Sequence, residues 1–229
     1  PLKWRETADY FLKSAGVQIL FHCRVVGVMR HSDIVTGVIV DTKSGFGKIN
    51  SLMTIDASGD ADVIHRAGWQ STKGRDGILQ NPTMIFRLGG VDIKKFLSHW
   101  GENTIGPDHI VQTIIEAEKT GNYRLPRKKI WIFPTTRPNE ILVNATRIMG
   151  PNNSDLDVTN PFDHTKAELA ARLQVREYYR FLKDKIPGCE DSFVNDTGVE
   201  VGIRQTRSIV GTKRLRNEDV TNRRKFKDA

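Results

Sequence analysis

The pattern of hydrophobic and polar residues first predicts a helix and then a β-meander. Apolar residues recur at helical spacing over residues 3–15, and Gly16 follows at the position of a helix C-cap. Residues 17–28, 34–40 and 48–57 instead alternate between apolar and polar, with polar turns between them. The beginning of the chain is therefore expected to form one helix and three antiparallel strands.

Shorter elements of both kinds are expected after the meander. The predicted helices cover residues 62–67, 92–100, 108–121 and 165–185. The predicted strands cover residues 83–88, 129–133, 140–148, 192–196 and 199–215. Asp92 and Asp108 are expected to cap their helices, and Thr165 with Glu168 has the spacing of a capping box. Residues 70–81 are polar and Gly-rich, which predicts a loop.

Residues 55–62 read Ile-Asp-Ala-Ser-Gly-Asp-Ala-Asp and join the last meander strand to the next helix. Ala57, Ser58 and Gly59 are small enough to let a ligand lie against the backbone. The helix that follows is expected to offer unpaired N–H groups and a positive dipole end to an anion. The stretch therefore predicts a phosphate- or nucleotide-binding turn, although small-residue turns of this kind are common in α/β proteins.

Two acidic residues in this turn admit two interpretations. Asp60 and Asp62 stand close enough in sequence to suggest a paired-carboxylate acid–base site. Carboxylates at the start of a helix more often cap its backbone N–H groups, and we favour capping for this pair. An acid that faced a phosphate group would also repel it.

The composition is that of an ordinary globular protein. The chain has 229 residues, of which 38% are hydrophobic and 27% are charged. No apolar stretch is long enough to span a bilayer, and no secretory signal is visible. The first residue is Pro1, so we expect the sequence to be part of a longer protein. The compartment stays open, with the cytoplasm as the default expectation.

The net charge of +8 is unevenly placed, because residues 204–229 hold nine Lys or Arg and three Asp or Glu. We call these residues the basic tail. Such a segment can face nucleic acid, an anionic cofactor or an acidic partner. No aromatic interleaving, zinc-finger spacing or ribonucleoprotein motif accompanies it. A basic nucleic-acid- or protein-binding module is therefore the alternative interpretation, and nucleic acid is not the expected partner.

Cysteine and histidine spacing predicts no metal site. Cys23 and Cys189 stand far apart, with no Cys-x-x-Cys pair, and are expected to be ordinary thiols rather than part of a disulfide, zinc or iron–sulfur site. No histidine has a partner at metal-ligand spacing. Among the histidines, His99, beside Trp100, best suits the role of a proton donor.

Three stretches, residues 55–62, 82–92 and 202–211, follow one another in the order of a known family. Together they resemble the FAD-dependent oxidoreductases described as heterodisulfide reductase A-subunit-like, within the wider glutathione-reductase-type flavoproteins. Ser58 and Ala61 replace the Thr and the second Gly of the family's Ala-Thr-Gly-Asp-Gly-Asp, and both side chains stay small. The family's N-terminal Rossmann turn, G-x-G-x-x-G, and its C-terminal flavin segment are both missing.

The resemblance implies an FAD-dependent oxidoreductase that transfers hydride or electrons between the flavin and an unidentified small-molecule substrate. The implied fold class is α/β and α+β. Residues 1–75 would form a partial, Rossmann-like FAD-binding domain with the β-meander. Residues 76–229 would form a mixed α+β substrate domain with a Pro/Asn/Asp/Ser-rich linker near 150–161. The fragment alone is expected to be inactive, because the missing segments of its own chain would complete the cofactor site.

The resemblance also implies which residues meet the cofactor. The backbone at Val25 would lie near the adenine, and Ala57, Ser58 and Gly59 would line FAD where the strand ends. Relatives can carry an iron–sulfur cluster, but this chain has no ligands for one. FAD and the substrate are thus the expected small-molecule partners, without a membrane span or a metal ion.

Catalytic residues are less clearly marked than the cofactor contacts. Arg204 and Arg207 lie three residues apart in the third matching stretch. If one of them enters the flavin cavity, its guanidinium group could hold a substrate carboxylate or stabilise negative charge on reduced flavin. A surface or interdomain salt bridge is an equally open interpretation for both. His99 completes the set of catalytic candidates.

Overall fold

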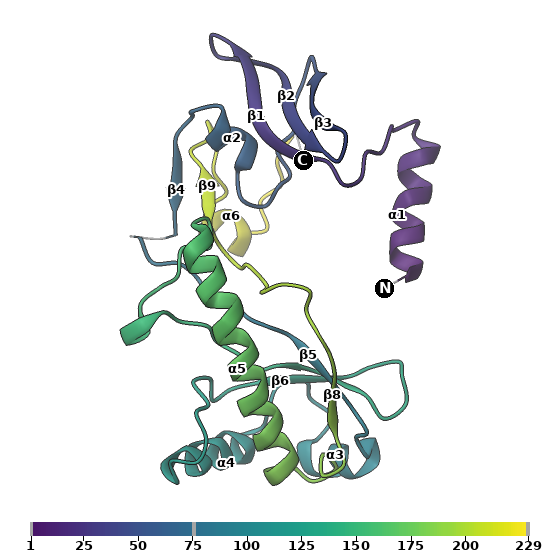
Figure 1. Cartoon of the computed structure of the whole chain (residues 1–229), viewed down its shortest axis with the longest axis vertical. Helices are drawn as coiled ribbons and strands as arrows, with labels where there is room; N and C mark the ends of the chain where they lie inside the picture. Colours follow the sequence, from purple (N-terminus) through teal and green to yellow (C-terminus); the bar gives the residue numbers. More distant parts are fainter. Residues whose placement is uncertain (1, 75–76, 228–229) are drawn as a thin grey trace. The chain divides into compact units, whose positions relative to one another are not determined.

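The computed structural model describes residues 2–74 and 77–227 (Figure 1). Contacts between Cα atoms divide the chain into two compact units, Pro1–Thr72 with Arg207–Ala229, and Lys73–Thr206. We call them the meander unit and the core unit. The C-terminal segment, which the sequence assigned to the second domain, thus lies with the first unit by its contacts. The cofactor and substrate roles predicted for residues 1–75 and 76–229 stay predictions.

The meander unit contains the predicted three-stranded sheet. Strands β1 (Arg24–His31), β2 (Ile34–Thr42) and β3 (Gly45–Asn50) pair antiparallel in the order β1-β2-β3. The register of β1 against β2 shifts between Val25 and Gly27, which marks a bulge in β1. The meander predicted from the alternating pattern is confirmed.

Two of the meander strands are shorter than the sequence predicted. The first begins at Arg24 rather than near residue 17, and the third ends at Asn50 rather than near residue 57. Exposed apolar residues fill these stretches: Val17, Leu20, Phe21, Leu52, Met53 and Ile55. Alternation fixes which face a side chain occupies, but a strand also needs a neighbouring strand for its hydrogen bonds. Within the described chain, Ser51 still donates its N–H to Thr36 of β2, but residues 52–57 pair with no strand.

Helix α1 (Leu2–Ser14) precedes the sheet and ends as predicted at Gly16, whose φ is +72°. The N–H of Gly16 donates to the carbonyl of Lys13 over 3.0 Å, and the N–H of Val17 donates to that of Leu12, also over 3.0 Å. These two bonds form a Schellman motif, which glycine favours because it adopts positive φ freely. The predicted helix is confirmed, and none of its described side chains is buried, so its apolar stripe is exposed.

The rest of the meander unit is built from short elements. Helix α2 (Asp62–Arg66) follows the turn at residues 55–62, as predicted. Strand β4 (Ser71–Lys73) pairs with β9 (Arg207–Ile209), so the expected loop over 70–81 begins with a short strand. Helix α6 (Asn217–Thr221) lies in the basic tail, where no helix was predicted.

The core unit is organised around a four-stranded sheet in the order β6-β7-β5-β8. Its strands are β5 (Phe86–Gly89), β6 (Trp131–Pro134), β7 (Ile141–Asn144) and β8 (Phe193–Thr197), and neighbours pair antiparallel. Each lies within or beside a strand that the apolar pattern predicted. The chain is thus mixed α and β with antiparallel sheets, and the Rossmann-like part of the predicted fold class stays a prediction.

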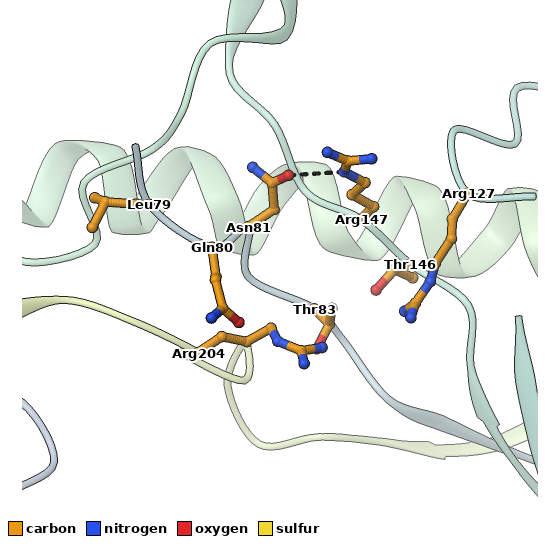
Figure 2. Close-up of a pocket in the computed structure, with 8 residues that line it drawn as sticks. All are labelled: Leu79, Gln80, Asn81, Thr83, Arg127, Thr146, Arg147 and Arg204. Atoms are coloured by element: carbon orange, nitrogen blue, oxygen red, sulfur yellow. Dashed lines mark hydrogen bonds between the residues drawn. The ribbon is translucent and has the colours of Figure 1, made fainter. Parts of the chain in front are cut away.

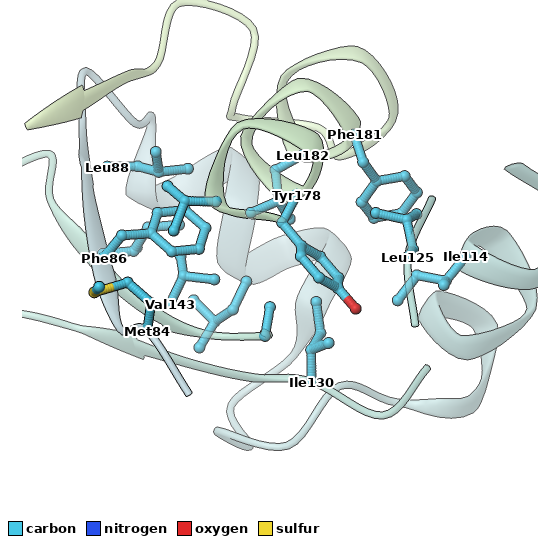
Figure 3. Close-up of a cluster of buried hydrophobic side chains, with 14 of the residues drawn as sticks. Met84, Phe86, Leu88, Ile114, Leu125, Ile130, Val143, Tyr178, Phe181 and Leu182 are labelled. Atoms are coloured by element: carbon cyan, nitrogen blue, oxygen red, sulfur yellow. The ribbon is translucent and has the colours of Figure 1, made fainter. Parts of the chain in front are cut away.

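Helices α3 (Ile93–Trp100), α4 (Asp108–Lys119) and α5 (Pro161–Lys185) pack with this sheet around one hydrophobic core (Figures 1 and 3). The large core side chains include Met84, Phe86, Leu88, Ile114, Leu125, Ile130, Val143, Tyr178, Phe181 and Leu182 (Figure 3). Helix α5 crosses the sheet and contributes the last three of these (Figure 1). The linker near 150–161 contains a single 3₁₀ turn, Pro151–Asn153.

Helix caps were predicted with mixed success. Asp92 caps α3 as expected, by accepting a backbone N–H of its first turn. Asp108 is the first residue of α4 and makes no capping hydrogen bond. Helix α5 is capped by Asn160, earlier than the predicted box of Thr165 and Glu168. A residue inside the helix cannot cap it, and the hydroxyl of Thr165 instead donates to a carbonyl one turn back.

A membrane-spanning helix is not found in the part of the chain that the structure describes, because none there is both long and apolar enough.

Candidate functional site

The turn at residues 55–62 is closed by the carboxylate of Asp56. Its oxygens accept the backbone N–H groups of Val63 at 2.9 Å and Ile64 at 3.1 Å, at the start of α2. They also accept the N–H of Ser58 at 3.1 Å. A buried carboxyl would resist ionisation, but hydrogen bonds from the Ser58 hydroxyl and these N–H groups outweigh burial and lower the pKa of Asp56.

Ser58 satisfies two more backbone donors, those of Asp60 and Asp62. Its Oγ donates to Asp56 over 2.6 Å and accepts the N–H groups of Asp60 at 3.3 Å and Asp62 at 3.0 Å. The first N–H groups of α2 are therefore all occupied by the turn itself. The prediction that this helix offers unpaired N–H groups to an anion is wrong. The carboxylate of Asp62 pairs with Arg66 and Arg207 instead of capping the helix, and capping by Asp60 stays a prediction.

What the turn does expose is its backbone. Ala57, Ser58 and Gly59 are all exposed, and the N–H groups of Ala57 and Gly59 make no hydrogen bond within residues 2–74 and 77–227. Gly59 has a φ of +81°, and a Cβ added there would meet nothing within 4 Å. Unbonded N–H groups beside small side chains are suited to donate to the phosphate or sugar oxygens of a nucleotide cofactor that lies against this turn.

Arg207 fixes the far side of the same turn. Its Nη1 donates to the carbonyl of Asp60 and to Oδ1 of Asp62, each over 2.9 Å. Arg66 also pairs with Asp62, at 2.8 Å. Burial raises the pKa of Asp62, but the hydrogen bonds and charges of the two arginines outweigh it and lower that pKa. Arg207 thus makes the salt bridge that was one of its two interpretations, and its catalytic role stays a prediction.

Arg204 lies in the core unit on the wall of a cavity of about 420 Å³ (Figure 2). The polar side chains on this wall come from distant parts of the chain: Gln80, Asn81, Thr83, Arg127, Thr146, Arg147 and Arg204. Three arginine residues therefore line one cavity. Only Arg204 among them was a candidate from the sequence.

Side chains around the cavity hold two of these arginines. Arg127 Nη1 donates to Asn144 Oδ1 over 3.1 Å, and its guanidinium carbon lies 4.2 Å from the centre of the Trp131 ring. Arg147 Nε donates to Asn81 Oδ1 over 2.8 Å, as Figure 2 shows. Both acceptors are neutral amides, so they orient the arginines without cancelling their charge.

The three arginines of the cavity have no ion-paired carboxylate among the described residues. Burial lowers the pKa of Arg127, and the positive charges of Arg204 and Arg147 lower it further. Across the described ranges, 2–74 and 77–227, none of these three arginines forms an ion pair with a carboxylate. Like charges gathered without a counter-charge favour an anionic ligand.

His99 is placed away from this cavity's wall. Its ring packs edge-to-face on that of His109, with centroids 5.0 Å apart, and its carbonyl lies 3.0 Å from His109 Nε2. Burial and the neighbouring His109 both lower the pKa of His99. The described residues contain no group of three or more His, Cys, Asp or Glu that could hold a metal ion. The role of His99 as a proton donor stays a prediction.

The basic tail contains one aromatic residue among its cations. Lys213 Nζ lies 4.2 Å from the centre of the Phe226 ring, and the guanidinium carbon of Arg224 lies 5.2 Å from it. The sequence-based statement that no aromatic residue is interleaved with the basic ones is therefore wrong at Phe226.

Sequence reasoning missed Arg127 and Arg147. Arg147 directly follows Asn144-Ala145-Thr146, so a polar strand end carried a faint signal for it. Arg127 stands in a run of basic residues, Arg127-Lys128-Lys129, that resembles any solvated surface. No local pattern relates either residue to Arg204.

The mixed fold and the exposed small-residue turn fit a protein that binds a nucleotide cofactor. A family model described as FAD dependent oxidoreductase matches residues 1–229, so the chain belongs to the FAD-dependent oxidoreductase family. The predicted family and its cofactor, FAD, are confirmed at that level. No curated protein and no solved structure matches the chain.

Proposed function

We propose that this chain contacts FAD through the exposed backbone of Ala57, Ser58 and Gly59 in an oxidoreductase acting on a small molecule. The observation that carries this proposal is the turn itself, whose own residues satisfy every helix donor and leave the N–H groups of Ala57 and Gly59 open. Bound FAD supplies the hydride or single-electron chemistry. Within the family, we place the chain with the heterodisulfide reductase A-subunit-like, glutathione-reductase-type proteins.

The residues around the turn keep its backbone in shape. Asp56 accepts three backbone N–H groups, and Arg207 ties Asp60 and Asp62 to the C-terminal segment. A backbone held from both sides does not have to be ordered when a ligand binds, so less entropy is lost. Asp56 and Arg207 are therefore positioning residues for the cofactor contact.

A second contact is proposed at Val25, near the adenine. Val25 is half-buried in β1, and the register shift directly after it leaves Val26 outside the regular ladder. Bulges of this kind expose backbone groups that a ligand can use. Residues 1–75 would then serve FAD and residues 76–229 the substrate, as parts of a longer enzyme.

A flavin titration tests the proposal. We would follow the fluorescence of FAD as the purified chain is added, for the native sequence and for Ala57→Trp. Ala57 is exposed, so a bulky residue there leaves the fold intact but covers the backbone that FAD would contact. The expected result is weak, saturable binding that Ala57→Trp abolishes.

A matched control is Ser44→Trp, in the exposed β2–β3 turn of the same unit. This variant should bind FAD like the native chain. Equal binding by the native chain and Ala57→Trp would overturn the proposed contact, and so would equal loss in both tryptophan variants.

A second candidate function is a nucleic-acid- or protein-binding module that uses the basic tail. The observation that favours it is Phe226 between Lys213 and Arg224, because an aromatic ring beside cations can stack on an unpaired base. A titration with single-stranded DNA at increasing salt separates the two. Tight binding that weakens steeply with salt, and that Phe226→Leu reduces, would favour this candidate over the flavin one.

A further inference from the structure

We infer that the cavity bearing Arg127, Arg147 and Arg204 binds a small anion through carboxylate or phosphate oxygens. Identifying this anion as the substrate rests on the proposed function, whereas its binding does not. The cavity lies wholly within the core unit, Lys73–Thr206. Its volume of about 420 Å³ falls within the range of small-molecule sites, roughly 300–1,000 Å³.

The first support is the uncompensated charge. Gathering three guanidinium groups costs free energy unless an anion or solvent offsets their repulsion. A carboxylate does approach the rim, because Asp155 accepts the N–H of Leu79 at 3.2 Å and Asn81 Nδ2 at 3.3 Å. Each of its oxygens accepts from a neutral donor, and it forms no ion pair with the arginines in the described structure.

The second support is that two side chains of α5, Tyr178 and Gln174, bind the backbones of Arg127 and Arg147. The hydroxyl of Tyr178 accepts the N–H of Arg127 and donates to its carbonyl, each over 2.8 Å. The side-chain amide of Gln174 likewise accepts the N–H of Arg147 at 2.9 Å and donates to its carbonyl over 2.8 Å. Both the N–H and the carbonyl of each of these two arginines are therefore hydrogen-bonded to a side chain of α5.

Gln174 and Tyr178 lie on one face of α5, because they are four residues apart in the helix. One rigid helix thus sets the positions of Arg127 and Arg147 together. The cation–π contact with Trp131 further restricts the position of the Arg127 guanidinium. Donors fixed before the ligand arrives lose little conformational entropy on binding, which is how an anion site gains affinity.

The third support is the placement of Arg204. Its segment is pinned beside the cavity by a β-bridge in which Thr83 N donates to the Gly202 carbonyl over 3.2 Å and Gly202 N donates to the Thr83 carbonyl over 2.6 Å. Arg204 itself is exposed, and its guanidinium group makes no hydrogen bond within the described residues. Its five donors are therefore available to a ligand.

These features select the chemistry of the ligand. A guanidinium group presents two parallel N–H donors that match the paired oxygens of a carboxylate or a phosphate. The amide side chain of Gln80 on the same wall adds a neutral donor and acceptor for the rest of the molecule. A neutral or cationic small molecule would leave the three positive charges unmet.

Calorimetric titrations of the full chain at low salt test the inference. The probes are citrate as a polycarboxylate, inorganic phosphate, and glycerol as a neutral polyol. We expect saturable binding of at least one anion and none of glycerol, and the comparison of citrate with phosphate identifies the oxyanion class. Affinity should fall with added salt, since screening weakens charge attraction at exposed groups.

Matched variants make the test specific. Arg204→Gln should weaken anion binding about 10- to 100-fold, the loss of a charge-assisted hydrogen bond. Arg176→Gln removes the same charge from an exposed position on α5, in the same unit and outside the cavity wall, and should change affinity by less than about twofold. Neither side chain forms a hydrogen bond within the described structure, so both variants should fold.

Absent or non-saturable anion binding would overturn the inference, as would an equal loss in Arg204→Gln and Arg176→Gln. The FAD titration is independent, because its variants lie in the other unit. Anion binding without FAD binding would leave the anion site standing and reject the proposed function. FAD binding without anion binding would leave the proposed function standing and reject the anion site.

Discussion

Arg207 and Asp62 are 145 residues apart in sequence, yet Arg207 Nη1 lies 2.9 Å from Asp62 Oδ1. This pair ties the C-terminal segment to the turn that precedes α2. The Arg207 side chain is only 11% exposed, whereas that of Asp62 is 34% exposed. The pair is thus shielded from solvent on one side, which makes it stronger than an ordinary surface ion pair.

Arg207→Gln should therefore destabilise the chain. We expect a loss of about 1–2 kcal/mol in the free energy of unfolding, because both Asp62 and the carbonyl of Asp60 lose a charged donor. Urea denaturation followed by circular dichroism measures it. The control is Arg223→Gln, an exposed site in the same segment, and equal effects of the two would contradict the role given to Arg207.

Asp56→Asn should loosen the turn from the other side. An amide has one acceptor oxygen instead of two and carries no charge, so it accepts the N–H groups of Val63 and Ile64 more weakly than the carboxylate does. Losing a helix cap costs about 1 kcal/mol. Asp41→Asn, at an exposed position in β2, is the control with the same charge change. If urea midpoints shift alike in both variants, Asp56 does not hold the turn.

The same carboxylate should give a distinctive pH dependence. The pKa of Asp56 is lowered below its usual 3.8, so the folded state binds this proton less readily than the unfolded state. Its stabilisation is fully present above pH 3.8 and is lost as pH falls through the lower, folded pKa. The difference in unfolding free energy between the native chain and Asp56→Asn should stay constant from about pH 7 to 5 and shrink below about pH 4. A difference that grows on acidification would contradict this assignment.

Tyr178→Phe should destabilise the core unit. The change removes the hydroxyl that satisfies both the N–H and the carbonyl of Arg127, next to a core in which Tyr178 is fully buried. Leaving such groups unpaired costs about 1–3 kcal/mol. Thermal and urea unfolding give the measurement, and Tyr10→Phe, on exposed α1, should be neutral. A Tyr178→Phe protein as stable as the native chain would show that water replaces the hydroxyl.

The purified chain should be colourless. The proposed FAD contacts are the exposed backbone of Ala57–Gly59 and the backbone at Val25, which together offer few hydrogen bonds and little apolar surface. Binding of that kind is too weak to survive dilution on a sizing column. Gel filtration with detection of visible flavin absorbance is the measurement. Yellow protein that keeps FAD through the column would show that the chain surrounds the cofactor more fully.

Features that depend on neighbours a few residues away were predictable from the sequence. The apolar spacing and Gly16 gave α1 and its C-cap, and alternation gave the meander. Asp92 predicted the start of α3 in the same way, because a capping residue and the N–H that it accepts lie within one helical turn. The small residues of 55–62 marked the turn for the same local reason, since Asp56 and Ser58 close it through hydrogen bonds to nearby residues.

Partnerships between distant residues were decided only by the tertiary structure. Residues 52–57 have the pattern of a strand but pair with no strand within the described chain, so they do not form one. The helix donors predicted to await a ligand are instead taken by Asp56 and Ser58, a choice that depends on how the turn folds back. Arg127, Arg147 and Arg204 share a cavity only because α5 and the Thr83–Gly202 bridge hold their segments there. The periodicity of the sequence indicates which face of an element a side chain lies on. Only the packing of the whole chain determines which residues contact that face.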